Sequence, residues 1–421
     1  MPITAELIAI GSELLWGEQV ETNSIFLGKC LREHGIDVRF KGVVGDQIND
    51  IASAIKQAIR RATLIVLTGG LGPTQDDVTR EAIASVIGQP LRRRNQAIRL
   101  IEKKTTTRPL TPPLLRQALV PIGAQLLENP QGIAPGFCTW WKSRLIIALP
   151  GVPHEAHTMF QTSLEWVLQH YGLPQGQEIP SKHFHTFGIT ESHVDAIIRS
   201  LRPSPSIRIG LQASPLGVTI SLTPHLSRVH DLKKFQVQLE IFSEKIRSRF
   251  AASLYAEDNQ HMEEIVGAAL QSRQLTLAIA ESCTGGLLGH RLTQIPGSSA
   301  YFDRGVICYS NRAKTELLGV SPSILRTYGA VSPVVAKAMA QGIRSRSQVD
   351  LGLSITGIAG PTGGSAHKPI GLVYVGLATP HNRTVVKEFR FHGDRNAIKL
   401  RASQGALDIL RRWLHGLPLE D

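Results

Sequence analysis

The chain has 421 residues, 42% of them hydrophobic and 19% charged, which predicts two or three folded domains and excludes a chain that is disordered throughout. Its four cysteines lie far apart without a C-x-x-C pair, so we expect a reduced cytoplasmic protein with neither a disulfide framework nor a zinc site. No apolar run approaches the ~18 residues of a membrane span and the first residues lack a signal-peptide pattern, so we expect no membrane partner.

Basic residues outnumber acidic residues by 46 to 34, a formal net charge of +12. Residues 92–116 hold eight of the basic residues and one acid, Glu102. This stretch has two interpretations, a phosphate-binding surface for nucleic acid or a solvated helix face. We favour the solvated face, because no aromatic side chains are interleaved for stacking on bases.

Strand and helix patterns alternate through residues 1–170, the first expected domain. Strands are predicted at residues 5–10, 38–44 and 64–68, and helices at residues 21–33, 50–61 and 78–87. A hairpin is predicted at residues 137–148, turning at residues 142–143. This alternation predicts an α/β fold with a parallel sheet covered by helices on both faces.

A boundary is expected near residues 170–174, and residues 171–256 then read as a small α+β module that links domains or forms a homodimer. Its strands are predicted at residues 184–187 and 217–222, and its helices at residues 191–200 and 232–249. The α/β rhythm returns in the third expected domain, residues 257–421. Strands are predicted there at residues 275–280, 306–309, 351–356, 370–378 and 385–391, and helices at residues 258–274, 285–293, 333–345 and 395–414.

A glycine loop with adjacent carboxylates follows the third strand. From Gly69 to Thr79 the chain reads GGLGPTQDDVT, a strand–loop–helix pattern whose backbone N–H groups suit a phosphate. Thr74 and Asp77 have the spacing of a capping box. Two adjacent acids at an anion site indicate Mg²⁺-type coordination, and a tight turn capped by Asp77 is the alternative. With neither a Walker A lysine nor G-x-G-x-x-G, the chain fits no ordinary P-loop ATPase or classical dinucleotide domain.

Three further segments accompany this loop: GSELLWG at residues 11–17, NPQGIAPG at residues 129–136 and LPGVPHE at residues 149–155. Together they resemble the molybdopterin-binding-like domain at the front of the CinA family, the competence/damage-inducible proteins. The resemblance implies a MogA-like α/β/α fold and a metal-dependent pyrophosphatase activity toward ADP-ribose. The expected phosphate contacts are Gly69, Gly70, Gly72 and Thr74. The expected ligands of a divalent metal ion (Mg, Mn or Co) are Asp76, Asp77, Glu13 and Asp46.

A serine lies at a second strand-to-helix turn, where residues 281–286 read ESCTGG. The backbone N–H groups of Cys283 and Thr284 can stabilise an oxyanion beside Ser282. Tyr309 ends the next predicted strand and Lys314 opens the helix after it, at the same edge of a parallel sheet. A desolvated lysine can lose its proton near neutral pH and act as a base. Spacing alone also allows Ser282 to be a helix cap and Lys314 a surface charge.

A second glycine loop, SITGIAGPTGG, occupies residues 354–364, and Arg395 opens the last predicted helix. A Thr-Gly loop with an arginine suits a phosphate monoester, although such glycines also mark ordinary turns. With residues 280–288, 296–314, 369–375 and 393–395, these segments resemble the C-terminal domain of the same family, the PncC-type nicotinamide mononucleotide deamidase.

This resemblance implies that Ser282 is the nucleophile or the activator of water, Lys314 its base, and Tyr309 a positioning or relay group, without a cofactor. Ser299 is a second candidate nucleophile, and the sequence leaves the choice open. Cys283 is a less suitable nucleophile, since it has no partnered histidine. The expected substrate contacts are Cys283, Thr284, Gly285, Thr356, Gly357 and Arg395.

We therefore expect a nicotinamide-nucleotide amidohydrolase, which converts nicotinamide mononucleotide and water into nicotinate mononucleotide and ammonia in pyridine nucleotide recycling. Small nucleotides are the expected partners. Two rival hypotheses remain. One is a nucleic-acid-associated competence protein, which the basic stretch would suit but which we do not favour. The other is a molybdopterin-binding module, which the first domain alone would support.

Overall fold

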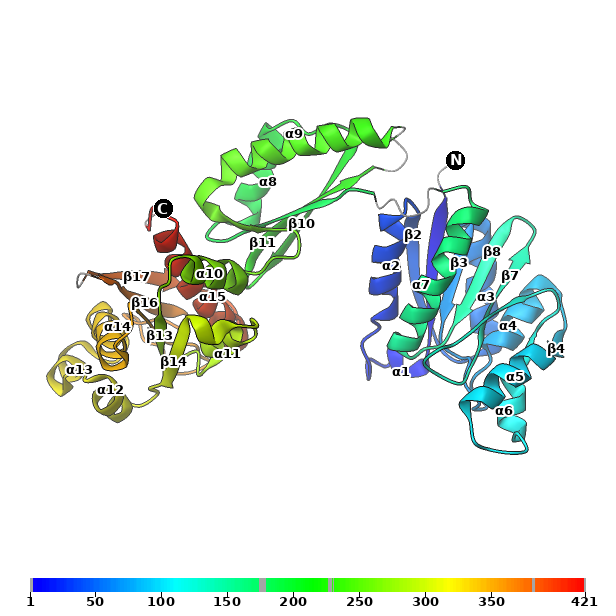
Figure 1. The fold of residues 1–421 in the computed structure, drawn as a ribbon, viewed down its shortest axis with the longest axis horizontal. Helices are drawn as coiled ribbons and strands as arrows, with labels where there is room; N and C mark the ends of the chain where they lie inside the picture. Colours follow the sequence, from blue (N-terminus) through cyan, green and yellow to red (C-terminus); the bar gives the residue numbers. More distant parts are fainter. Residues whose placement is uncertain (1–2, 174–178, 226–228, 230, 381–382, 420–421) are drawn as a thin grey trace. The chain divides into compact units, whose positions relative to one another are not determined.

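The computed structural model describes residues 3–173, 179–225, 229, 231–380 and 383–419 (Figure 1). It contains two compact units, residues 1–180 with 224–232, and residues 181–223 with 233–421, and each is described by itself. The boundary expected near residues 170–174 ends at Pro174, which lies outside the described residues. Within the described ranges, no helix is long and apolar enough to cross a membrane.

The first unit is built around a six-stranded sheet. Its elements are, in chain order, β1 (Thr4–Ile10), α1 (Ser12–Leu15), α2 (Asn23–Glu33), β2 (Asp37–Val44), α3 (Ile48–Arg61), β3 (Leu64–Thr68), α4 (Thr79–Ile87), β4 (Leu91–Arg93), α5 (Asn95–Lys104), α6 (Pro112–Arg116), β5 (Leu119–Pro121), β6 (Gln125–Leu127), β7 (Gly136–Trp141), β8 (Arg144–Leu149) and α7 (Pro153–His170).

The strand order of this sheet is β2-β1-β3-β8-β7-β6. Four neighbouring strands, β2, β1, β3 and β8, run parallel, while the predicted hairpin adds β7 antiparallel to β8. Apolar side chains of α3 and α4 cover one face and those of α2 and α7 the other. The predicted α/β arrangement is confirmed, and the carboxyl ends of four parallel strands meet at one edge, where ligands bind in such folds.

The second unit begins with a four-stranded antiparallel sheet of order β10-β11-β9-β12. Its elements are β9 (Lys182–Thr186), α8 (Glu191–Ser200), β10 (Ile207–Ser214), β11 (Gly217–Pro224), α9 (Leu232–Phe250) and β12 (Leu254–Glu257). Two of these strands, β10 and β12, have no counterpart among the predicted elements. In β10, Ile207, Ile209 and Leu211 do alternate with other residues as in a half-buried strand, so that signal was present and was missed. Strand β12 has only four residues, too few for a clear pattern.

The remainder of this unit contains a five-stranded sheet of order β14-β13-β15-β16-β17. Its elements are α10 (Met262–Ser272), β13 (Leu277–Glu281), α11 (Leu287–Thr293), a short 3-10 helix (Ser298–Ala300), β14 (Phe302–Ile307), α12 (Asn311–Leu318), α13 (Pro322–Tyr328), α14 (Pro333–Ser347), β15 (Leu351–Gly357), β16 (Leu372–Ala378), β17 (Thr384–Arg390) and α15 (Arg395–Leu414). Only β14, β13 and β15 run parallel, since β16 and β17 are added antiparallel.

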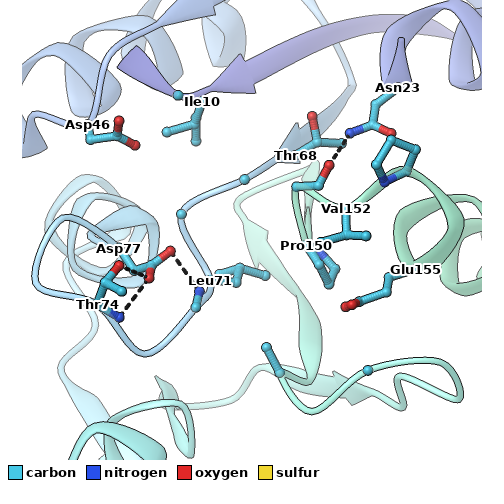
Figure 2. Close-up of a pocket in the computed structure, with 18 of the residues that line it drawn as sticks. Ile10, Asn23, Asp46, Thr68, Leu71, Thr74, Asp77, Pro150, Val152 and Glu155 are labelled. Atoms are coloured by element: carbon cyan, nitrogen blue, oxygen red, sulfur yellow. Dashed lines mark hydrogen bonds between the residues drawn. The ribbon is translucent and has the colours of Figure 1, made fainter. Parts of the chain in front are cut away.

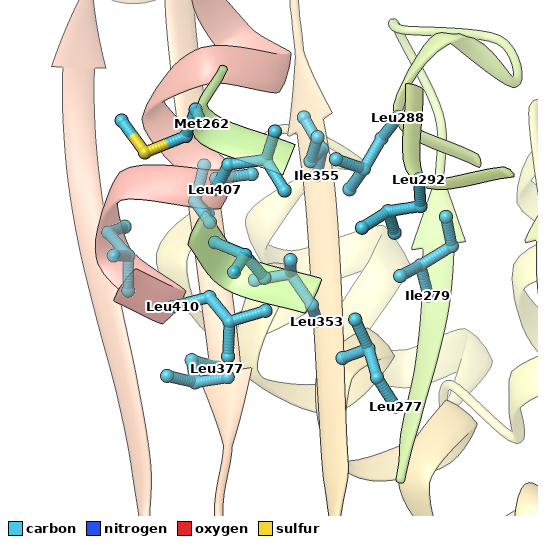
Figure 3. Close-up of a cluster of buried hydrophobic side chains, with 14 of the residues drawn as sticks. Met262, Leu277, Ile279, Leu288, Leu292, Leu353, Ile355, Leu377, Leu407 and Leu410 are labelled. Atoms are coloured by element: carbon cyan, nitrogen blue, oxygen red, sulfur yellow. The ribbon is translucent and has the colours of Figure 1, made fainter. Parts of the chain in front are cut away.

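Aliphatic side chains fill the space between this sheet and the helices beside it (Figure 3). On one face, Leu277 and Leu353 of the sheet pack with Leu407 and Leu410 of α15. On the other face, a second cluster joins the sheet to α12, α13 and α14. Burial on both faces fixes the strands rigidly, so the turns at their carboxyl ends are held in defined positions.

Candidate functional site

The Ser282 turn follows β13 in the second unit, as predicted. Its position is tied to the sheet, because the Ser282 backbone N–H donates to the Ile355 carbonyl of β15 at 3.0 Å. Gly285 and Gly286 both have positive φ values, 62° and 96°, which a side chain would disfavour. The chain therefore reverses sharply into α11 and leaves the serine at the carboxyl edge of the sheet.

A buried lysine contacts this serine. Lys314 Nζ lies 3.1 Å from Ser282 Oγ, and it also donates to the carbonyl oxygens of Cys308, at 2.8 Å, and Tyr309, at 3.3 Å. Lys314 is only 1% exposed, so it is not the surface charge of the alternative interpretation. Burial lowers the pKa of the Lys314 ammonium, which favours the neutral amine that a base requires.

Tyr309 and Arg395 form the rim of this site. The Tyr309 side chain is 61% exposed, and its hydroxyl accepts a hydrogen bond from Arg395 Nη2 at 3.1 Å. Arg395 Nη1 donates to the Gly360 carbonyl at 2.5 Å. The structure thus brings together Ser282, Lys314, Tyr309 and Arg395, which come from three segments of the chain.

Ser299 lies at the opposite edge of the same sheet. Strands β13 and β14 are parallel, with Leu277 opposite Phe302 and Glu281 opposite Ile307. Ser299 precedes β14 in the short 3-10 helix, whereas Ser282 follows β13. Four residues of strand separate the two edges, about 13 Å along the sheet. The geometry therefore selects Ser282 as the serine that meets Lys314.

The expected substrate contacts near the glycine loops differ in accessibility. Thr356 is fully buried and its hydroxyl donates to the Ala330 carbonyl at 2.8 Å, so it braces the fold and is not available to a ligand. Gly357, at the end of β15, packs against Val373 and is partly exposed. Burial raises the pKa of the Cys283 thiol to about 12, which argues against a thiolate nucleophile.

The backbone around Ser282 keeps two donors available. Among the described residues, the N–H groups of Cys283 and Thr284 donate to no backbone carbonyl. The Thr284 side chain is fully buried, and its hydroxyl has no partner in the described part of the chain. The N–H groups thus remain candidates for the predicted oxyanion site, while the Thr284 hydroxyl has no accessible surface for substrate.

The sequence interpretation missed Glu281, which shapes the turn. Its buried carboxylate accepts hydrogen bonds from the backbone N–H groups of Gly286, Leu288 and Gly289, at 3.0, 3.1 and 2.8 Å. A charged acceptor for three donors holds the first turn of α11 against the end of β13. The sequence did contain a signal for this role, an acidic residue at the end of a buried apolar strand. Because burying a carboxylate without partners is costly, such a residue is expected to accept hydrogen bonds from nearby donors.

A cavity of about 700 Å³ opens at the carboxyl edge of the sheet in the first unit (Figure 2). All eight residues expected there from the sequence line it: Gly69, Gly70, Gly72, Thr74, Asp76, Asp77, Glu13 and Asp46. Segments that follow β1, β2, β3 and β8 converge on this cavity, which is the result of the parallel strand order.

The glycines of this loop are required by the fold itself. A β-carbon on Gly69 would lie 2.2 Å from the Ile10 carbonyl oxygen, and one on Gly70 would lie 2.1 Å from Thr79 Oγ1. The expectation that these glycines serve the approach of a ligand is therefore incomplete, because both positions already contact neighbouring protein atoms. The loop packs tightly between β1 and the start of α4.

The predicted capping box is wrong. Helix α4 begins at Thr79, beyond both Thr74 and Asp77. The Asp77 carboxylate instead accepts hydrogen bonds from the backbone N–H groups of Gly72 and Thr74, at 2.7 and 2.8 Å (Figure 2). Asp77 thus closes the loop on itself, as the alternative tight turn required.

Two arginines hold the carbonyl groups of the same loop. Arg80, buried under it, donates to the Leu71 carbonyl at 2.8 Å, and burial lowers its pKa to about 10. Arg116 donates to the carbonyls of Thr74 and Asp77 at 2.8 and 2.9 Å. Arg116 belongs to the basic stretch at residues 92–116. One of the eight basic groups of this stretch therefore binds the loop of its own chain and not an external partner.

The acids that line the cavity do not form a ready metal centre. Among the described residues, no group of three His, Cys, Asp or Glu side chains is placed to hold a metal. Asp77 is committed to the loop, and Asp46 Oδ2 accepts from the Ser12 N–H at 2.7 Å. Asp76 is exposed, and hydrogen bonding from Thr74 lowers its pKa. A divalent ion bound by one of the remaining carboxylates, such as Asp76, would need further oxygens from the phosphates of a ligand.

Comparisons with known proteins cover both units. The chain matches the family model "CinA C-terminal domain" over residues 259–414 and the model "Probable molybdopterin binding domain" over residues 6–170. A putative competence-damage inducible protein of Halothermothrix orenii is 42% identical over 415 residues, which is 97% of this chain and 98% of that protein. The chain belongs to the CinA family. A protein of the same description from Moorella thermoacetica is 43% identical over 412 residues, again 97% and 98% of the two chains.

A solved CinA structure from Thermoplasma acidophilum, described as having unknown function, is 39% identical. It covers 39% of this chain and 98% of its own, with a TM-score of 0.38. In the present chain, the CinA C-terminal model covers the Ser282 turn and the molybdopterin-binding model covers the cavity of the first unit. Both predicted sites therefore lie within regions that match a family model.

Proposed function

We propose that the Ser282 site is a nicotinamide-nucleotide amidase, which hydrolyses nicotinamide mononucleotide to nicotinate mononucleotide and ammonia. The observation that carries the proposal is the contact of 3.1 Å between Lys314 Nζ and Ser282 Oγ, made by a buried lysine whose pKa is lowered. A hydroxyl beside an unprotonated amine is an activated nucleophile, and amide hydrolysis is a reaction that such a pair can perform.

Two carbonyl groups orient the amine in this reaction. The neutral amine has two N–H groups, which can donate to the Cys308 and Tyr309 carbonyls. Its lone pair then faces Ser282 Oγ and can accept the hydroxyl proton. The same two bonds keep the amine in place after it has been protonated, so it can return the proton to the leaving group.

The chemical steps follow from this arrangement. Ser282 Oγ forms a bond to the carboxamide carbon while its proton passes to Lys314 Nζ. The tetrahedral oxyanion is stabilised by the Cys283 and Thr284 N–H groups, and collapses as the C–N bond breaks. The departing nitrogen takes the proton from Lys314 and leaves as ammonia. Water then attacks the resulting ester with the same base, which releases the carboxylate product and restores the Ser282 hydroxyl.

A direct route is also open to the same residues. A water molecule held by Ser282 and deprotonated through Lys314 could attack the amide without an ester intermediate. Rapid mixing with substrate, acid quenching and mass spectrometry of the intact protein separates the two routes, because only the first gives a covalent adduct on Ser282.

The proposed activity is tested by incubating the purified full chain with nicotinamide mononucleotide. Ammonia should be released in equal amount to nicotinate mononucleotide, measured by coupled assay and by chromatography. No product above the level of a Ser282→Ala control would reject the amidase function.

A second activity is proposed for the cavity of the first unit, the hydrolysis of the ADP-ribose pyrophosphate bond with a divalent cation. The lining residues that the structure describes include no Lys, Arg or His. They include six carboxylates: Glu13, Glu21, Asp46, Asp76, Asp77 and Glu155. A pyrophosphate would be repelled from such a surface unless a cation accompanied it. Release of AMP and ribose 5-phosphate from ADP-ribose, with and without Mg²⁺, tests this proposal.

A further inference from the structure

Helix α15 presents two basic side chains one turn apart beside the Ser282 turn. Arg395 and Lys399 are separated by four residues, so they lie on the same face of this helix. The position that a β-carbon on Gly285 would occupy lies 3.8 Å from Lys399 Nζ. Gly285 follows Ser282 by three residues, so the ammonium group lies close to the serine that we propose as nucleophile.

The two basic groups differ in what they already bind. Arg395 donates to the Gly360 carbonyl and to the Tyr309 hydroxyl, so its guanidinium is held by the protein. In the described part of the chain, Lys399 Nζ forms no hydrogen bond or ion pair, although its side chain is half-buried. The nearest acid in sequence, Asp394, uses its carboxylate to cap α15 at the Ala397 N–H. Lys399 therefore carries an unneutralised positive charge at the edge of the site.

We propose that Lys399 binds the phosphate group of the nucleotide substrate and that Arg395 positions Tyr309. This inference rests on the proposed amidase function. An ammonium group beside an exposed glycine turn can approach a phosphate closely, because Gly285 adds no side chain between them. The Gly285 N–H donates to the Ser282 carbonyl at 3.2 Å, so these residues close a tight turn whose end Cα atoms lie within about 7 Å of each other. A mononucleotide bound with its amide at Ser282 can thus place its phosphate beyond Gly285, at the Lys399 ammonium.

The substrate class follows from this placement. A nucleoside such as nicotinamide riboside has the same amide but no phosphate, so it gains nothing from Lys399. The protein should therefore prefer the mononucleotide to the nucleoside, and this preference should depend on the charge of residue 399.

The test compares kcat/KM for nicotinamide mononucleotide and nicotinamide riboside in the wild-type full chain and in Lys399→Met. The ratio of the two kcat/KM values should fall by about 10- to 100-fold, the effect of losing a charge-assisted hydrogen bond, with the change mainly in KM for the mononucleotide. Lys399→Arg should keep most of the preference. Lys337→Met, which removes an exposed lysine of α14, is the matched control and should not change the ratio.

An unchanged ratio in Lys399→Met would overturn the assignment, as would an equal loss with both substrates. A wild-type protein that releases no ammonia would instead reject the amidase function. In that case calorimetric titration with nicotinate mononucleotide decides on Lys399 independently of turnover. Weaker binding in Lys399→Met supports the phosphate site, and equal or absent binding in both proteins overturns it.

Discussion

Lys314 Nζ and Ser282 Oγ lie 3.1 Å apart although the two residues are separated by 32 positions in the chain. The contact exists because β13 and β14 are parallel neighbours, so that the turn after one strand meets the helix after the other. The lysine belongs to α12 and is 1% exposed, and that burial is also what lowers its pKa. One packing arrangement thus provides both the distance and the basicity.

Replacing the two candidate serines separates their roles. Ser282→Ala should reduce kcat for nicotinamide mononucleotide by at least about 10³-fold, because the attacking or water-activating oxygen is lost. Ser299→Ala should remain within about twofold of wild type, because Ser299 lies at the other edge of the sheet. Steady-state ammonia release measures both variants, and circular dichroism confirms folding. A large loss in Ser299→Ala with normal activity of Ser282→Ala would reverse the assignment.

The pH dependence of the reaction should report Lys314. Because a base must be unprotonated, kcat/KM should rise with pH through the pKa of Lys314. Burial places this pKa below the ordinary value of 10.5, so the rise should be centred below pH 10.5. Lys314→Arg retains the charge but cannot deprotonate at ordinary pH, so kcat should fall by about 10²–10⁴-fold.

A phosphate-binding role for Lys314 predicts a different result. In that case arginine would largely replace the lysine, and any defect would appear in KM. Measurement of kcat and KM for Lys314→Arg between pH 6 and 10 therefore distinguishes the two roles. A near-wild-type kcat would remove Lys314 from the catalytic residues.

Divalent cations should control the first unit. Turnover of ADP-ribose should disappear in chelator and return with Mg²⁺ or Mn²⁺, since the cavity is lined by carboxylates. Asp76→Ala should raise the metal concentration needed for half-maximal activity, because Asp76 is exposed and not committed to the loop. Asp77→Ala should instead lower stability and activity together, because it removes the acceptor of two loop N–H groups.

The ammonia assay provides the control for these variants. Both should retain the amidase activity, since the residues proposed for it lie in the other unit. Full ADP-ribose turnover in chelator would contradict the metal requirement.

A buried ion cluster should make Asp408 important for stability. Its carboxylate accepts hydrogen bonds from Arg411 at 2.7 Å and Arg412 at 2.8 Å, and all three side chains are buried. Asp408→Asn removes the negative charge that both buried guanidinium groups contact, and breaking a buried ion pair typically costs about 3–5 kcal/mol. Unfolding by urea is followed through the loss of amidase activity. The urea concentration at the midpoint of this transition should be lower for Asp408→Asn than for the wild type.

Asp195→Asn is the matched control, because it removes an exposed carboxylate paired with Arg199 on α8. Such surface pairs contribute less than about 1 kcal/mol. Similar midpoints for Asp408→Asn and Asp195→Asn would show that the buried cluster does not support the fold.

The carboxyl-terminal fragment of residues 257–421 should retain the amidase activity, because Ser282, Lys314, Tyr309 and Arg395 all belong to it. It should unfold at a lower temperature than the full chain, because Arg411 donates to the Ala252 carbonyl, which the fragment lacks. Calorimetry and ammonia release on the fragment measure both effects. A fragment that folds without activity would show that residues outside it complete the site.

Most of the buried strands and both glycine loops could be predicted from the sequence alone, whereas short or partly exposed elements such as β10 and β12 were not. Apolar strands such as Leu64–Thr68 are buried on both faces, so their composition marks them, and the residues that follow them locate both candidate sites. The family resemblance is carried by the same short segments, and the comparisons confirm it.

Other properties depend on pairs of segments that are distant in the chain. The approach of Lys314 to Ser282, the distance of Ser299 from both and the unpaired charge of Lys399 follow from which strands are neighbours and in which register. Local pattern contains no information on these pairings. The roles of Glu281 and Asp77 likewise depend on backbone N–H groups that only the folded turns bring into reach, so the tertiary structure alone decided them.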